Sequence, residues 1–373
     1  MTSASEGSAR VAYAASGVDV AAGERAVGLL RQRIVAAGAA APDLLGGLGG
    51  FGAAFELPTG YARPVLVSAT DGVGTKTEIA RLLSRRDSIG RDLVAMCADD
   101  VVCHGARPLF FLDYVAVGRL DPEAVATLVG GVADGCAEAG CALVGGETAE
   151  HPGLMDEDAF DLAGFCVGIV ERDRLIDGST ARLGDAVLGM AASGLHANGY
   201  SLVRTALASS GVQLDRPVAE VAAMYGIAPE RGAEGTLGEA LLTPTTIYAP
   251  HVLALADAMA AGGFRLGGLA HVTGGGLPGN LPRAVGPGLG TRVDPSAWPV
   301  PLVVALMAAM AGLDSAEMRA TFNGGIGMAA VVEPRAVEAA LGMLAARGIE
   351  AWVIGEVAAT AMTGPSRYLE AGP

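Results

Sequence analysis

A segment at residues 64–83, PVLVSATDGVGTKTEIARLL, has the residue types that bind phosphate. A strand over 64–70 is followed by the loop DGVGT and a helix over 75–83. The glycines, Gly72 and Gly74, let the backbone approach a ligand closely. The unpaired N–H groups where the helix begins, at Thr75 and Lys76, suit an anion. The segment therefore predicts a phosphate-binding loop.

Lys76 is the only lysine among the 25 basic residues of the chain. A lysine ammonium is a compact point charge, whereas the arginine guanidinium is a planar fork. A crowded glycine loop that holds a phosphate favours the smaller cation. The alternative is a plain Asp-Gly turn beside a solvated lysine.

Three carboxylates indicate a site for a hard cation. Asp71 ends the strand before the loop, and Glu147 closes a strand within a second glycine-rich loop, VGGETAE. Asp100 lies on the apolar face of a helix over 92–105, where an ionised carboxylate needs a partner or a metal. Asp99 lies off that face and is expected to be solvated. Mg²⁺ bridges carboxylates and phosphates, although a structural ion pair also explains Asp100.

Two loops in the second half of the chain indicate a polar-ligand site. SGLHANGYS places His196 and Asn198 between a strand and a helix, and AHVTGGGLPGNLP places His271 before three consecutive glycines. Such loops bind anions or polar groups. Each histidine taken alone is as well explained by a structural role.

Composition excludes several classes of protein. The net charge of −15 and the absence of a basic patch argue against nucleic acid as a partner. The longest uncharged apolar run, residues 298–313, is too short to cross a membrane, and no apolar signal-peptide core is present. Five cysteines without a CxxC pair indicate free thiols. A cytoplasmic protein is expected.

The 373 residues suffice for two domains, with a boundary in the polar connector at 175–185. We expect an N-terminal domain over 1–175 and a C-terminal domain over 176–373. Strands and helices alternate in both halves, which predicts α/β or α+β folds. Asp121 and Asp314 are expected to cap helices. The expected helices span 22–37, 122–139, 200–209, 250–261 and 301–312, the expected strands span 109–117, 142–144, 160–170, 186–191, 327–332 and 352–357, and 216–235 is expected to be irregular.

These loops, in this order, resemble those of the phosphoribosylformylglycinamidine cyclo-ligase family. The similar segments cover nearly the whole chain and include PVLVSATDGVGTK, IGRDLVAMCADDVV, PLFFLDYVAVGRLD, GGETAEHPG, SGLHANGYSLVR, AHVTGGGLPGNLPR and TFNGGIGM. The resemblance implies a homodimer whose N-terminal mixed sheets pair into a shared barrel, with a C-terminal α/β domain. It also implies ATP-dependent closure of formylglycinamidine ribonucleotide to aminoimidazole ribonucleotide, with ADP and phosphate released, in purine biosynthesis.

The resemblance also implies roles for individual residues. Mg²⁺·ATP is expected on Asp71, Asp100 and Glu147, with Lys76 on the phosphates and Asp113 nearby. The substrate side is expected to include His196 and the residues Asn198, Thr273, Gly274, Gly275 and Gly276. A general base is not identified, and His196 and His271 are the candidates. Asp99 departs from the family, which usually has Asn there.

Several other families belong to the same superfamily as the cyclo-ligases. A selenophosphate synthetase is expected to have a reactive Cys in an N-terminal glycine-rich segment, and GGLGGFG has none. Thiamine-monophosphate kinase and a hydrogenase-maturation protein are not expected to combine FFLDYVAVGRLD with TFNGGIGM. A catalytically silent nucleotide-binding regulator is the alternative from another class.

Overall fold

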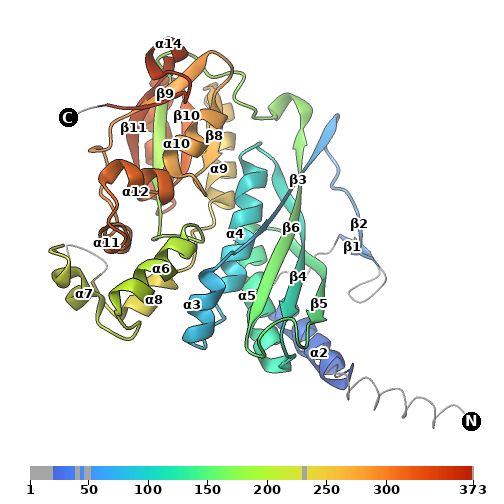
Figure 1. Ribbon diagram of the computed structural model, residues 1–373. Helices are drawn as coiled ribbons and strands as arrows, with labels where there is room; N and C mark the ends of the chain where they lie inside the picture. Colours follow the sequence, from blue (N-terminus) through green and yellow to red (C-terminus); the bar gives the residue numbers. More distant parts are fainter. Residues whose placement is uncertain (1–19, 38–42, 46–51, 229–232, 372–373) are drawn as a thin grey trace, which may run out of the picture.

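The computed structural model describes residues 20–37, 43–45, 52–228 and 233–371, and their main elements form two sheets with helices (Figure 1). The first sheet is built from residues 64–171 and the second from residues 186–370. The chain is therefore an α+β protein with one mixed sheet in each half. The domain boundary between residues 175 and 176 stays a prediction.

The N-terminal sheet has the order β3-β6-β4-β5, in which β4 and β5 are parallel and the other neighbours antiparallel. Helices α2, α4 and α5 lie together on one side of it, while the small antiparallel β1–β2 pair lies on the other (Figure 1). Its elements are β1 (Leu44–Leu45), β2 (Ala54–Phe55), β3 (Pro64–Gly72), β4 (Arg107–Val117), β5 (Ala142–Glu150), β6 (Phe160–Glu171), α2 (Val20–Ala37), α3 (Lys76–Leu82), α4 (Ile89–Val102), α5 (Pro122–Ala139) and the 3-10 turn η1 (Arg172–Arg174).

The C-terminal sheet has the order β12-β9-β11-β7-β10-β8 and is antiparallel except for the β12–β9 pair. Its strands are β7 (Ala186–Ala191), β8 (Leu266–His271), β9 (Leu289–Val293), β10 (Ile326–Val332), β11 (Ala351–Ala359) and β12 (Tyr368–Glu370). The helices of this half are α6 (Tyr200–Ser210), α7 (Val218–Met224), α8 (Leu237–Leu241), α9 (Ala249–Ala261), α10 (Gly276–Asn280), α11 (Leu302–Met310), α12 (Ser315–Thr321), α13 (Val337–Ala346), α14 (Thr360–Thr363) and the 3-10 turns η2 (Leu281–Ala284) and η3 (Pro334–Ala336).

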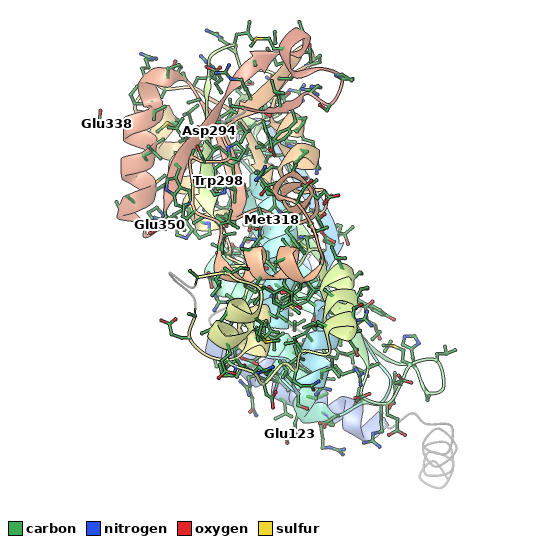
Figure 2. All side chains as sticks on the ribbon, turned by 60° about the vertical axis from the view of Figure 1, so that its left-hand side comes forward. Glu123, Asp294, Trp298, Met318, Glu338 and Glu350 are labelled. Atoms are coloured by element: carbon green, nitrogen blue, oxygen red, sulfur yellow. The ribbon has the colours of Figure 1, made fainter. Side chains whose placement is uncertain are left out.

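Local sequence signals explain where several helices begin. The Asp121 side chain accepts hydrogen bonds from the backbone N–H groups of Glu123 and Ala124, and Pro122, which has no N–H, is the first residue of α5. Asp314 caps α12 in a reciprocal capping box with Glu317. Both expected caps are confirmed. In Figure 2, Trp298 and Met318 lie among the interior side chains of the C-terminal half, whereas Glu338 stands at its surface.

Two expectations about secondary structure are wrong. Residues 216–235 were expected to be irregular, but α7 lies within them because Val218, Val221 and Ala222 bury one face of a short helix. The strand expected over 142–144 continues through Gly145 and Gly146 to Glu150, because its parallel pairing with β4 continues beside the glycines. Glu147 thus lies inside a strand and does not end one.

One face of the N-terminal sheet is not covered by helices. Side chains alternate between the two faces of a strand, and on this face Leu66, Tyr114 and Phe165 are 57%, 41% and 40% exposed. The ring of Phe55, on β2, packs against Phe110 at one part of the same face. This mixed apolar surface is unusual for a monomer.

In the described part of the chain, the helices are too short or too polar to cross a lipid bilayer. The five cysteines are free thiols, as expected, and four of them are buried.

Candidate active site between the two domains

Helix α4 stands between the two halves of the molecule (Figure 1) and is buried on two sides. One side packs on the N-terminal sheet. A second stripe, at Asp92, Met96, Asp99, Asp100 and Cys103, follows the spacing of one helix face and meets the C-terminal half. We call these five residues the interdomain stripe. Asp92 contacts Thr245, and Met96 contacts Asn198. Asp99 lies near the backbone of Tyr248 and Ala249. Asp100 pairs with His271, and Cys103 contacts Met328.

The pair formed by Asp100 and His271 joins two of the predicted site residues across the domain interface. His271 Nδ1 lies 2.9 Å from Asp100 Oδ1. Burial by itself lowers the pKa of His271, but the hydrogen bond to Asp100 and the nearby negative charges outweigh it and raise that pKa. Asp100 keeps 40% of its side chain exposed. Its carboxylate is thus anchored on one oxygen and accessible to a ligand.

Asp71, at the end of β3, is close enough to interact electrostatically with Asp100 and His271. Burial raises the pKa of Asp71, a hydrogen bond from the Gly72 N–H lowers it, and the charge of Asp100 raises it further. A carboxylate whose pKa is raised by the charge of a second carboxylate nearby forms with it a suitable pair of ligands for a divalent cation.

The structure reverses the expected exposure of Asp99 and Asp100. Asp99 is fully buried, and its carboxylate lies near the backbone amides of Tyr248 and Ala249 without a hydrogen bond of ordinary geometry to any described residue. The expectation assumed that α4 buries a single face, whereas its interdomain stripe buries a second one. Burial raises the pKa of Asp99 to about 7, and the charge of His271 and the backbone amides of Tyr248 and Ala249 offset this only in part.

Lys76 does not reach an open phosphate site in this structure, which corrects its expected role. Its side chain is fully buried, and its ammonium donates to Asp92, to the His196 carbonyl at 3.0 Å and to the Thr243 carbonyl at 2.8 Å. Nζ lies 2.9 Å from both oxygens of Asp92. An ammonium has three N–H donors, and all three are used. Lys76 therefore fastens two C-terminal loops to α4.

His196 is also a structural residue in this arrangement rather than an accessible base. It is 1% exposed, has φ 61°, and its Nε2 accepts a hydrogen bond from the Ser193 N–H. Burial, followed by the positive charges of His271 and Lys76, lowers its pKa well below the usual value. The imidazole is neutral and helps to hold its loop in place.

The loops expected on the substrate side do converge. Asn198 Nδ2 contacts the Met96 sulfur on α4, and a side chain at Gly274 would meet the Asn198 amide. Gly276 has φ 58°, and any Cβ there would overlap the backbone carbonyl of Arg319. Thr273 is half-buried and Gly274 and Gly275 are exposed. The Thr273–Gly276 loop is therefore closely packed at Gly276 and open to solvent at Gly274 and Gly275.

Two of the expected acids lie apart from this cluster. Asp113 shares a row across the sheet with Asp71, two strands away, and its side chain is buried beneath the helices, which raises its pKa to about 7. Glu147 belongs to the next row, with Gly72 and Tyr114, so its side chain points to the opposite face. Within the described chain, no three acidic, His or Cys side chains form a metal-binding group. The expected three-acid site is thus not assembled in one chain.

Sequence reasoning missed three residues of this region. Asp92 pairs with Lys76 and also accepts from the N–H and Oγ1 of Thr245 at 2.7 and 2.6 Å. Asn280 and Arg283 follow the triple glycine, in GNLPR, and border a cleft beside Asp100 and His271. The usable signal was the polar Asn and Arg directly after the expected loop.

Family models match both halves of the chain. The model described as the N-terminal domain of AIR synthase related proteins matches residues 53–170, and the model of the C-terminal domain matches residues 182–364. The phosphoribosylformylglycinamidine cyclo-ligase of Geobacillus kaustophilus is 47% identical over 93% of this chain and 95% of its own. That of Sorangium cellulosum is 48% identical with the same coverage.

Solved structures share the fold at low sequence identity. Thiamine-monophosphate kinase from Stenotrophomonas maltophilia superposes with a TM-score of 0.62 at 18% identity, covering 92% of this chain and 96% of its own. The hydrogenase maturation protein HypE of E. coli gives 0.59 at 20%, covering 88% and 90%. The identity to the cyclo-ligases is far higher and extends over both domains. The chain belongs to the phosphoribosylformylglycinamidine cyclo-ligase family.

Proposed function

We propose that this chain uses ATP to close the imidazole ring of formylglycinamidine ribonucleotide, giving aminoimidazole ribonucleotide, ADP and phosphate. The observation that supports it most is the 47–48% identity to cyclo-ligases over 93% of the chain. A further support is that Asp71 and Asp100 lie close together at the domain interface, and that His271, which pairs with Asp100, precedes the Thr273–Gly276 loop in the chain.

The chemistry matches what these residues offer. A formamide oxygen is a poor leaving group until it is phosphorylated, and phosphoryl transfer requires positioning and charge neutralisation more than a protein nucleophile. Mg²⁺ would be held by Asp71 and Asp100, together with oxygens of ATP, and would neutralise the developing phosphate charge. Two carboxylates suffice for this, since Mg²⁺ on nucleotides is usually held by one or two of them.

His271 has a positioning role in this proposal. Its hydrogen bond to Asp100 Oδ1 fixes the carboxylate and leaves the other oxygen for the cation. Its own Nε2 is buried and has no partner among the described residues. His271 therefore lies behind Asp100, and its Nδ1 proton stays in the hydrogen bond to the Asp100 carboxylate.

Turnover tests the function. Wild-type protein with Mg²⁺, ATP and formylglycinamidine ribonucleotide is expected to yield aminoimidazole ribonucleotide. The assay measures the rate at which this product forms. Asp100→Asn keeps the shape of the side chain but removes its charge, so kcat/KM should fall about 100-fold and the Mg²⁺ requirement should rise. Asp134→Asn, at an exposed position on α5, is the matched control. ATP binding without product would support the silent regulator, and an unchanged Mg²⁺ dependence in Asp100→Asn would contradict the ligand role.

We also propose a homodimer formed through the uncovered face of the N-terminal sheet. Leu66, Tyr114 and Phe165 give that face its exposed apolar area, and a second copy of the same sheet would bury it. Phe165→Glu should convert the dimer into a monomer in sedimentation velocity, because it places a charge in the apolar interface. Met362→Glu, at an exposed position on α14, should leave the sedimentation unchanged. A Phe165→Glu protein that remains dimeric would place the interface elsewhere. A cytoplasmic location remains a prediction.

A further inference from the structure

A cleft of about 390 Å³ separates β3 and the end of α4 from β8 and the segment after α10. Asp100 and His271 form part of its wall, so it adjoins the candidate active site. A volume of this size lies within the range of small-molecule sites. A ligand in this cleft would touch both domains.

Arg283 is the one arginine in the wall of this cleft within the described part of the chain. It is exposed, and no described carboxylate lies within ion-pair distance of it. Other arginines of the C-terminal half, such as Arg265 and Arg319, form ion pairs with acidic residues. Arg283 therefore lines the cleft as a cation without an acidic partner among the described residues, and it is available to an anionic ligand that enters there.

The guanidinium of Arg283 is also oriented by a buried residue. Nη1 donates to Asn280 Oδ1 at 3.1 Å. The amide nitrogen of Asn280, which is 2% exposed, donates to the Gly276 carbonyl at 2.9 Å and lies 3.3–3.4 Å from the carbonyls of Gly274 and Thr273. The same asparagine thus joins the glycine loop to the arginine. The other N–H donors of this guanidinium make no hydrogen bond to a described residue, so they can bind a ligand.

The charges around the cleft favour an anion at Arg283 rather than elsewhere. Asp100 is already paired with His271. Asp177, the other acid in the wall, accepts from the Ser179 N–H. Lys76 is buried and has three partners. His104, also in the wall, uses Nδ1 on the Ile176 carbonyl. Among the described wall residues, Arg283 is therefore the permanently charged cation left for a bound phosphate.

We propose that Arg283 binds the phosphate monoester of the ribonucleotide substrate in the cleft between the two domains. The inference rests on the proposed function for the identity of the substrate, but the chemistry of the subsite is independent of it. An arginine fork binds two phosphate oxygens at once. Anchoring this end of the substrate leaves its formamide and amidine groups to reach toward the Asp71 and Asp100 carboxylates.

Arg283→Met tests the subsite in two ways. In turnover assays, KM for formylglycinamidine ribonucleotide should rise about 10- to 100-fold, which is the usual effect of losing hydrogen bonds to a charged group. KM for ATP should be unchanged. In calorimetric titration, ribose 5-phosphate should bind wild-type protein and bind the variant more weakly by a similar factor. Arg283→Lys keeps the charge without the fork and should fall between the two.

Arg292→Met, in an exposed ion pair outside the cleft, is the matched control and should match wild type in both assays. The melting temperature of Arg283→Met should also match wild type, because Arg283 is exposed. A lower melting temperature with unchanged KM would mean that Arg283 only supports Asn280 and would overturn the proposal. A rise in KM for ATP alone would assign the arginine to the nucleotide. If wild type shows no turnover but binds ribose 5-phosphate through Arg283, the proposed reaction fails and the subsite stands.

Discussion

Replacing Lys76 with methionine is expected to destabilise the protein by about 3–5 kcal/mol, the usual effect of breaking a buried ion pair from one side. The methionine fills much of the space but leaves the buried carboxylate of Asp92 without its cation. It also removes the donor to the carbonyls of His196 and Thr243. Differential scanning calorimetry and chemical denaturation measure the loss.

Three further variants define the cause. Lys76→Met combined with Asp92→Asn should recover much of the lost stability, because no buried charge remains and Asn can still accept from Thr245. Lys76→Arg should be destabilised despite its charge, since a planar fork does not match three acceptors around one nitrogen. Arg85→Met breaks an exposed ion pair with Glu239 and should change stability by less than about 1 kcal/mol. A fully stable Lys76→Met would show that the buried pair is not what joins the loops to α4.

Asp99→Asn is expected to raise stability at pH 8 by as much as about 4 kcal/mol. In the folded state, burial raises the pKa of Asp99 to about 7, whereas the unfolded chain has the ordinary value of 3.8. The folded protein therefore binds more protons than the unfolded chain between those two values. Wild-type stability must fall as the pH rises through that interval. The raised pKa of His271 adds a loss of the same sign.

Melting temperatures measured from pH 4 to pH 8 test this prediction. The profile of Asp99→Asn should be flatter than that of wild type, and the two proteins should converge at the acid end. Asp134→Asn removes an exposed carboxylate from α5 and should keep the wild-type profile. A variant that is less stable than wild type at pH 8 would mean that ionised Asp99 is stabilised by contacts that the buried geometry does not contain.

Helix caps and the glycine-rich loop before α3 were predicted correctly because interactions between neighbouring residues decide them. The caps at Asp121 and Asp314 act within one turn of helix, so their chemistry is readable from neighbouring residues. The strand, loop and helix at 64–83 formed as expected because glycine and β-branched residues decide such boundaries locally. The motifs also brought Asp100, His271 and Asn198 to one interface.

The errors concern contacts between residues far apart in the chain. Asp99 was expected in water because a single apolar stripe was read on α4, and nothing in the helix sequence states that another domain covers a second side. Glu147 was grouped with Asp71, but a shift of one residue along a strand turns a side chain to the other face of the sheet. Lys76 looked like a phosphate ligand because two of its three partners, the carbonyls of His196 and Thr243, lie more than 100 residues away.

Arg283 and Asn280 were missed for a different reason. Both follow the triple glycine within a few residues, so the sequence placed them near the substrate loop. Their pairing depends on the turn that directs the Asn280 amide back to the loop carbonyls. Such a turn is visible only when the backbone is known.

The interdomain stripe of α4 restricts how this protein can be recombined with its relatives. Each of its five residues is matched to a different position in the second half of the chain, including two buried carboxylates. A chimera joined near residue 175 would unite a helix from one parent with loops from another. Such hybrids would inherit mismatched buried charges unless α4 were exchanged together with the C-terminal half. For this protein the unit of exchange is therefore the C-terminal domain together with helix α4.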